Sequence, residues 1–432
     1  MLKIFLLSFL LYFSINNKVI KISFYEEEKS NIEDFIFNNK LITNLKIGTP
    51  IQIIPAIITF ETYYFLISNI EKNRKYNKID SSTFSEISDL SYITFFDKIF
   101  EGIYSTEIID FNNNNITKIN YFLIEKHNNR LNINSAVIGL HLKYFDTKEI
   151  ETNLLFQLKK KEKINLNIFS FNYNNNNKGE LIIGKIPHEF NKSFDINSYK
   201  YTIIEDIKND YCYGISFENI FFGNSSENQN FKAEFSIDIN GFIGSNKYKK
   251  YVNENFFDFY FKLNKCFIKN FTYNYNNYIQ YFCNKEIDIK NKILNINFYH
   301  KILNFTFEID DEILWKEIDN KYYFLVIFNE NENNFWVFGR PFLKKYFIVF
   351  DVERKLLGFY LNNNIFDNNN KFYYYSNILI FILTLFIIFL LFFIKKNIKN
   401  NKKIRANELK ENIDYTINDE DFYKKLNNIN IK

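Results

Sequence analysis

Few residues in this sequence have the type and spacing that a known kind of chemistry requires. The histidines occur singly, without metal-ligand spacing, at His127, His141, His188 and His300. The sequence has no Gly-x-Ser-x-Gly turn for a nucleophilic serine and no glycine-rich loop that could bind phosphate. We therefore expect neither a metal site nor a cofactor. The remaining candidates for acid–base chemistry are carboxylates, and with 50 Asp and Glu residues in the chain their types alone single out none of them.

The three cysteines fit an oxidising compartment. Cys266 and Cys283 are close enough in the sequence to close a short loop, and we expect a disulfide between them, with Cys212 left over. Sequons for glycosylation occur at Asn115, Asn191, Asn224, Asn270 and Asn304. In so asparagine-rich a chain, many of these sequons arise by chance.

The N-terminus predicts entry into the secretory pathway. Lys3 is followed by the apolar stretch Ile4–Phe13, which is long enough for a signal peptide and too short to span a bilayer. We place the signal peptide at residues 1–22. The following stretch, Ile22–Phe37, is short for a pro-segment.

A second apolar stretch predicts a membrane anchor near the C-terminus. Ile378–Ile394 is interrupted by one polar residue, Thr384, and six basic residues with no acidic one follow it up to Arg405. A buried core helix is the alternative, but positive charge after the span favours a single-pass type I protein. We expect a transmembrane helix over residues 377–394, a cytosolic tail over 395–432, and the rest of the chain in the lumen or outside the cell.

Composition and charge limit the classes of function that fit this sequence. A hydrophobic content of 47% is ample for a large core. The formal net charge of +4 is spread along the chain without a basic stripe, so we expect no nucleic-acid partner.

Short apolar runs, broken by Asn, Lys and Asp clusters, predict a mainly β region between residues 38 and 362. One helix is expected, over Asn153–Lys161. The two halves contain similar features in the same order. In the first half a strand near Ile57 is followed later by two bulky residues and Gly139, and in the second half a strand near Phe235 is followed later by two bulky residues and Gly339. This repetition predicts a duplicated structure, with lobes at residues 38–190 and 191–362.

Several segments resemble the pepsin-like aspartic proteases (family A1). Lys46–Gln52, K-I-G-T-P-I-Q, is similar to the family's opening segment, and Ser91–Asp110 to its flap hairpin. Lys163–Gly184 is similar to the run that closes the first lobe. The most specific stretch is Phe335–Leu361, which resembles the closing segment of the second lobe almost position by position. The resemblance implies a bilobal acid-protease fold whose cleft takes a peptide or protein, here with one transmembrane helix added.

The resemblance also implies a catalytic pair. Enzymes of this family use one aspartate from each lobe, and the two share a proton and activate a water molecule. Each aspartate is carried on an Asp-Thr/Ser-Gly turn, whose glycine lets the two turns approach closely.

The first of these turns departs from the family pattern. Counted from Gly48, the aspartate position falls at Thr59, whose neutral hydroxyl cannot act as the shared-proton base. Glu61 is the nearby acid, but it lies where the glycine should be.

The second turn can be aligned in two registers. If Asp238 is the family's aspartate, Asn240 replaces the glycine. If Ser236 takes the aspartate position, Asp238 takes the glycine position, as Glu61 does in the first turn. An ordinary turn aspartate is a third interpretation of Asp238. In the flap, the substrate-facing tyrosine falls at Phe95, which keeps the ring and lacks the hydroxyl.

These departures leave three hypotheses for function. The first is a pseudoprotease that keeps the fold and the anchor and binds a peptide or protein. The second is an active aspartic endopeptidase with a rearranged pair, Glu61 with Asp238. The third is a structural membrane glycoprotein whose cleft is filled by its own Phe and Tyr side chains.

Overall fold

The computed structural model describes residues 18–361, except for short gaps at 69–75, 96–97, 112–115, 128–135, 143–148, 175–176, 206–211, 223–224, 286–294 and 331–334, and a few single residues beyond them. Contacts divide the chain into two units, residues 1–363 and 364–432. The apolar N-terminal stretch and nearly all of Ile378–Ile394 lie outside the described residues. Within the described residues, no helix is both long and apolar enough to cross a membrane.

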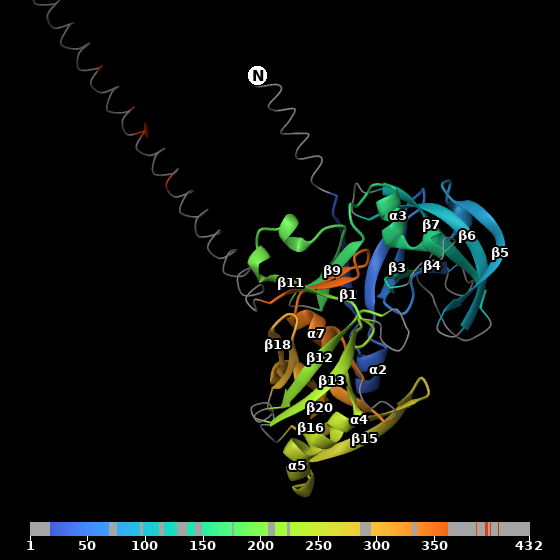
Figure 1. The fold of residues 1–432 in the computed structure, drawn as a ribbon. Helices are drawn as coiled ribbons and strands as arrows, with labels where there is room; N and C mark the ends of the chain where they lie inside the picture. The colour runs from blue at the N-terminus through green and yellow to red at the C-terminus, as the bar shows by residue number, and fades with distance from the viewer. Residues whose placement is uncertain are drawn as a thin grey trace, which may run out of the picture. The chain divides into compact units, whose positions relative to one another are not determined.

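The described part of the first unit is mainly β, and most of its strands belong to two sheets (Figure 1). The larger sheet contains, in spatial order, β11 (Tyr199–Ile203), β24 (Leu356–Tyr360), β23 (Ile348–Asp351), β9 (Ile168–Asn174), β10 (Lys178–Ile183), β1 (Ile20–Glu26), β2 (Leu41–Ile47), β3 (Gln52–Thr59), β8 (Ala136–Gly139), β4 (Phe65–Ser68), β7 (Ile116–His127), β6 (Lys98–Asp110) and β5 (Ser85–Phe95).

The second sheet lies entirely in the second half of the sequence. Its order is β18 (Phe305–Ile309), β17 (Ile296–His300), β12 (Gly214–Phe222), β13 (Ser225–Phe235), β22 (Phe335–Phe338), β14 (Phe242–Ser245), β21 (Val326–Asn329), β16 (Asn276–Asn284), β20 (Lys321–Phe324) and β19 (Trp315–Ile318), and β15 (Cys266–Tyr273) pairs with β16. Over residues 18–361, as far as they are described, the α-helices are α2 (Ile32–Phe37), α3 (Leu154–Lys160), α4 (Asn246–Val252), α5 (Asp258–Lys262), α6 (Asp311–Leu314) and α7 (Arg340–Lys345), with a π-helix at Asn253–Phe257.

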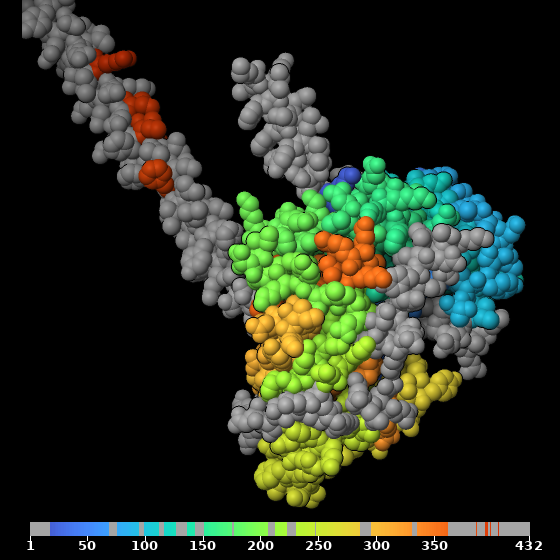
Figure 2. Space-filling model, viewed as in Figure 1, coloured from blue at the N-terminus to red at the C-terminus, as the bar shows by residue number. Residues whose placement is uncertain are grey.

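The two halves share the larger sheet. Strands β23, β24 and β11 come from the second half, and β23 pairs antiparallel with β9 of the first, with Phe350 opposite Phe169. Figure 2 shows the orange surface of the C-terminal strands among green residues from the middle of the chain. The rings of Phe169 and Phe350 stack with their centroids 4.9 Å apart. One buried apolar cluster therefore runs through both halves.

The duplication predicted from the sequence is present in the strand pairing. In the first half β3 runs parallel to β8, β8 runs antiparallel to β4, and β4 runs parallel to β7. In the second half β13 runs parallel to β22, β22 runs antiparallel to β14, and β14 runs parallel to β21. The same four-strand arrangement therefore carries the turn after β3 and the turn after β13.

A glycine lies against each of these turns. Gly139 ends β8, and an added Cβ would overlap the carbonyl oxygens of Thr62 and Tyr64. Gly339 follows β22, and its Cβ would overlap the carbonyl oxygens of Ile239 and Gly241. Because these obstacles are backbone atoms, any side chain at either glycine would push the turn away.

The helix expected over Asn153–Lys161 is α3, for which Asn153 is the N-cap and accepts the N–H of Phe156. The β structure starts earlier than residue 38, because β1 begins at Ile20 and pairs with β10 and β2. A signal peptide ending at residue 22 would therefore remove the first residues of a sheet strand.

Replacement of either glycine should strongly destabilise the fold. We expect Gly339→Ala and Gly139→Ala each to lower the free energy of unfolding by about 2–4 kcal/mol, because backbone must move to admit the new Cβ. Chemical denaturation measures this. The matched control is Gly244→Ala, where the nearest atoms belong to side chains at 3.0–3.1 Å. Equal effects at all three positions would contradict the close approach.

Candidate active site

The turns after β3 and β13 make the same hydrogen bonds to the strand beneath them. The N–H of Gly139 donates to the carbonyl of Tyr64 at 3.0 Å. In the second half, the N–H of Gly339 donates to the carbonyl of Gly241, also at 3.0 Å. Tyr64 and Gly241 therefore occupy equivalent places, and this fixes how the two turns align.

Counted back from these residues, Thr59 aligns with Ser236 and Glu61 aligns with Asp238. Local bonds agree, because the N–H of Glu61 donates to Thr59 Oγ1 at 3.0 Å and the N–H of Asp238 donates to Ser236 Oγ at 3.2 Å. Of the two registers left open by the sequence, the structure has the one in which Ser236 is equivalent to Thr59. Each turn thus begins with a hydroxyl and carries an acid two residues later.

The two hydroxyls are buried and stay neutral. Thr59 is 2% exposed and Ser236 is 9% exposed. Each accepts a backbone N–H from its own turn, so each helps to hold the turn closed. Because a hydroxyl has no charged form at ordinary pH, neither residue can be the base of an acid–base pair.

Asp238 connects the two halves of the site. Its side chain is buried, and Oδ2 accepts the N–H of Phe60, in the opposite turn, at 2.8 Å. The other oxygen, Oδ1, has no hydrogen-bond partner among the described residues. The Phe60 ring points away into the shared core, 4.9 Å from the ring of Tyr213 and 5.3 Å from that of Phe350.

Glu61 interacts with Asp238 through their charges. Desolvation by the surrounding protein raises the pKa of Glu61, and the negative charge of Asp238 raises this pKa further, whereas the positive charge of Lys40 lowers it. The side chain of Glu61 nevertheless keeps contact with solvent. The pair therefore combines a buried carboxyl, Asp238, with a more open one that holds its proton to a higher pH than usual.

The segment before β2 packs against the second turn. The carbonyl of Ile36, in α2, accepts the N–H of Asn240 at 2.8 Å. Glu33 of the same helix forms an ion pair with Lys269 of β15 at 2.7 Å. This role of the segment is not predictable from its length and composition, which suggest only a short pro-segment.

The β15–β16 hairpin lies over α2. The ring of Tyr273 stacks on Phe37 at 4.1 Å, and its hydroxyl donates to Asn38 at 3.2 Å. Burial raises the pKa of Tyr273, and Glu61 and Asp238 add to this effect. The phenol therefore lies within electrostatic reach of both acids.

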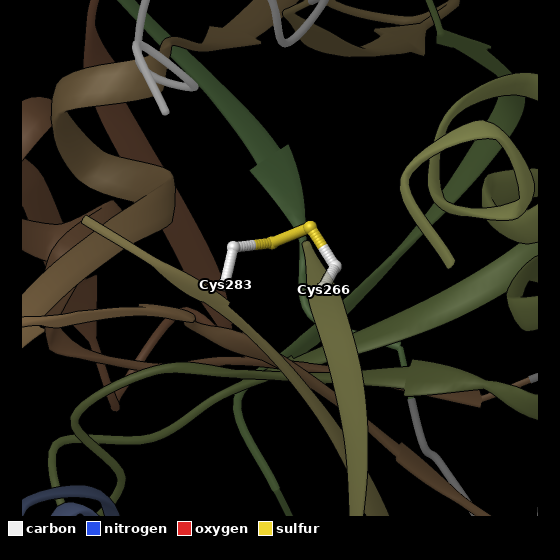
Figure 3. Close-up of a disulfide and its surroundings, with 2 residues drawn as sticks. All are labelled: Cys266 and Cys283. Atoms are coloured by element: carbon white, nitrogen blue, oxygen red, sulfur yellow. A yellow bond between two sulfur atoms is a disulfide. The ribbon is translucent and has the colours of Figure 1, made fainter. Parts of the chain in front are cut away.

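The expected disulfide closes the base of this hairpin. Cys266 and Cys283 are opposite each other on β15 and β16, with the sulfurs 2.04 Å apart (Figure 3). The remaining cysteine, Cys212, is buried and outside the disulfide.

The hairpin expected at Ser91–Asp110 is formed by β5 and β6. Phe95 ends β5 and pairs with Lys98, so its backbone is at the tip of the hairpin. The side chain of Phe95 lies outside the described part. Among the described residues, no group of three or more His, Cys, Asp or Glu side chains could hold a metal ion.

The sequence matches the model of a known protein family. The sequence model of the eukaryotic aspartyl protease family matches residues 59–361, more than half of the chain, beginning at the residue that ends β3. A search of curated proteins finds no match.

The raised pKa of Glu61 should make stability depend on pH. In the unfolded chain Glu61 loses its proton near its usual pKa of about 4.3, but the folded chain holds it to a higher pH. This contribution is complete below the unfolded pKa and is lost as pH rises through the folded one. We expect Glu61→Gln to equal the wild type near pH 4 and to be more stable at pH 8 by up to about 1 kcal/mol, a small effect because the side chain meets solvent.

Denaturation midpoints at a series of pH values measure this difference. Glu254→Gln, which removes an exposed acid from the π-helix, is the matched control and should leave the profile unchanged. A wild-type profile parallel to that of Glu61→Gln would contradict the assignment.

Proposed function

Because the chain belongs to the eukaryotic aspartyl protease family, we propose that it is a membrane-anchored, pepsin-like pseudoprotease that binds a peptide or protein segment between its lobes. One observation carries the loss of activity. Thr59 and Ser236, which hold equivalent places in the two turns, are both hydroxyl residues. The family's reaction needs a carboxylate at each of these places, because two carboxyls must share one proton.

The acids of this chain lie two residues beyond those places. The backbone N–H of Glu61 donates to the hydroxyl of Thr59, and that of Asp238 donates to the hydroxyl of Ser236. The side chain of each acid therefore leaves the backbone two residues beyond the position of the family's aspartate. A displacement of about 1 Å from the productive position is enough to reduce catalysis severely. Binding depends less on that placement, and the fold, the hairpin and the joined lobes remain.

A second candidate is an active endopeptidase in which Glu61 and Asp238 form the pair. The observation that favours it is the electrostatic effect of Asp238 on Glu61, since two interacting carboxyls are the basis of a shared proton. The bond from Phe60 to Asp238 would then orient one member of the pair.

Peptidase assays separate the two candidates. We expect the full-length chain, purified in detergent, to cleave no randomised fluorogenic peptide in a pepstatin-sensitive manner between pH 3 and pH 7. The comparison is a quadruple variant, Thr59→Asp, Glu61→Gly, Ser236→Asp and Asp238→Gly, which restores the aspartate and the glycine of each turn. Cleavage by the wild type that is lost in both Glu61→Gln and Asp238→Asn would establish the second candidate.

We also propose that Ile378–Ile394 anchors the chain as a single-pass type I protein in the secretory pathway or at the cell surface. In membranes from an expressing cell, we expect the chain to resist alkaline carbonate extraction, because an apolar span stays in the bilayer. Deletion of residues 377–394 should release it. Extraction of the wild-type chain by carbonate would refute the anchor.

A further inference from the structure

A cavity lies between the N-terminal segment and the second half of the chain. One wall is formed by Glu26–Ser30, Phe35 and Asn39, and the other by residues of α6, β19 and α7. We call this cavity the side pocket. Its volume of about 760 Å³ lies within the range of about 300–1,000 Å³ that is typical of ligand sites. The hydroxyls and acids of the two turns are outside its lining.

Bonds to α7 hold the N-terminal wall in place. Lys344 forms an ion pair with Glu26 at 2.8 Å, and the buried Arg340 donates to the carbonyl of Asn39 at 2.6 Å. Both ends of the N-terminal wall are therefore fixed to the second half of the chain. Since the side pocket is already formed, a ligand does not have to supply the free energy of opening it.

The floor of the side pocket is apolar. Trp315 and Leu325 are each 5% exposed, and Pro341 is buried. Phe35 and Ile313 are partly buried and complete this floor. Such a surface gains most from an apolar side chain of the ligand, because burial removes apolar area from water on both sides.

The lysines of the side pocket already have partners. Among the described residues, seven acids and four lysines line it. Lys29, Lys344 and Lys345 each form an ion pair with one of these acids. The ammonium of Lys316 lies over the ring of Phe35, 4.9 Å from its centroid. These cations therefore leave part of the negative charge unbalanced.

Three carboxylates at the rim of the side pocket carry this excess. Glu28, Glu312 and Asp319 are exposed, and no described residue forms an ion pair with any of them. Like charges gathered around one cavity give it a negative potential, which attracts a cation. The rim thus selects for positive charge, and the floor selects for an apolar group.

We propose that the side pocket binds a basic peptide segment, in which an apolar side chain covers Trp315 and Leu325 and a neighbouring lysine or arginine reaches Glu28, Glu312 or Asp319. A metal ion or a polyamine would leave the floor uncovered, and an anion would be repelled by the rim. This inference goes beyond the proposed function, because it assigns a second binding site away from the two turns.

The bound segment belongs to another protein. Lys395–Arg405 of this chain is also basic, with six lysine and arginine residues and no acid. The anchor proposed above, however, would place that segment on the opposite side of the membrane from the side pocket. The occupant is therefore a basic segment of a partner in the lumen or outside the cell.

Tryptophan fluorescence tests this inference, because the chain has two tryptophans. Trp315 lines the side pocket, whereas Trp336 is 1% exposed and lies in the core. The full-length chain in detergent is titrated at pH 7 with the acetylated, amidated tripeptide Lys-Leu-Lys. We expect a saturable change in emission that is absent in Trp315→Phe. The tripeptide Glu-Leu-Glu should give no change.

Variants of the rim measure its contribution to affinity. Loss of one exposed charge pair should raise the Kd for Lys-Leu-Lys roughly two- to fivefold in Glu312→Gln, and further when Glu28→Gln and Asp319→Asn are added. Lys316→Met should lower the Kd. Glu254→Gln, which removes an exposed acid outside the side pocket, is the matched control and should leave the Kd unchanged. Since the three rim acids are exposed, melting curves of these variants should match that of the wild type.

The outcomes separate this inference from the proposed function. No saturable change with Lys-Leu-Lys, or an equal Kd in the triple rim variant and the wild type, would overturn it. Equal affinity for spermidine would overturn the choice of a peptide. Binding that is lost in Glu61→Gln would place the peptide at the turns and overturn the side pocket as its site. Pepstatin-sensitive cleavage of peptides by the wild type would refute the pseudoprotease and leave the fluorescence result standing.

Discussion

The close contact between the two turns is the constraint on which the rest of the site depends. Each turn passes over a glycine at the end of a strand or just after it, and the carbonyls of the turn lie where a Cβ would otherwise be. This contact brings Asp238 near enough to accept the N–H of Phe60 from the opposite turn. The position of every polar group at the centre follows from it, including the hydroxyls of Thr59 and Ser236.

The aromatic residues provide the support behind these turns. Phe60 points into a cluster that includes Phe169, Tyr213 and Phe350, in which rings from both halves pack edge to face, tilted or stacked. Tyr213 also donates its hydroxyl to the carbonyl of Leu140, just after Gly139. Some of the 52 Phe and 31 Tyr residues of the sequence therefore support both turns from behind.

The fold was largely predictable from the sequence, because the signals were strong and local. The Phe335–Leu361 segment pointed to the family, and Asn153 marked the start of α3. The register of the second turn was not predictable, because Asp238 and Ser236 both fit a turn and only hydrogen bonds to a distant strand distinguish them. The packing of α2 was missed for a similar reason, since its partners lie more than two hundred residues away.

The sharing of one sheet by both halves also affects how the protein is made. Strand β9 is completed by β23, which is synthesised about 180 residues later, and at about 5–20 residues per second this takes roughly 10 to 40 s. During that interval the edge of β9 that later pairs with β23 has no partner strand, which is the condition under which strands mispair. The nascent chain must therefore be protected until its last strand emerges. A ribosome that stalls before residue 348 would leave a first lobe with an open edge.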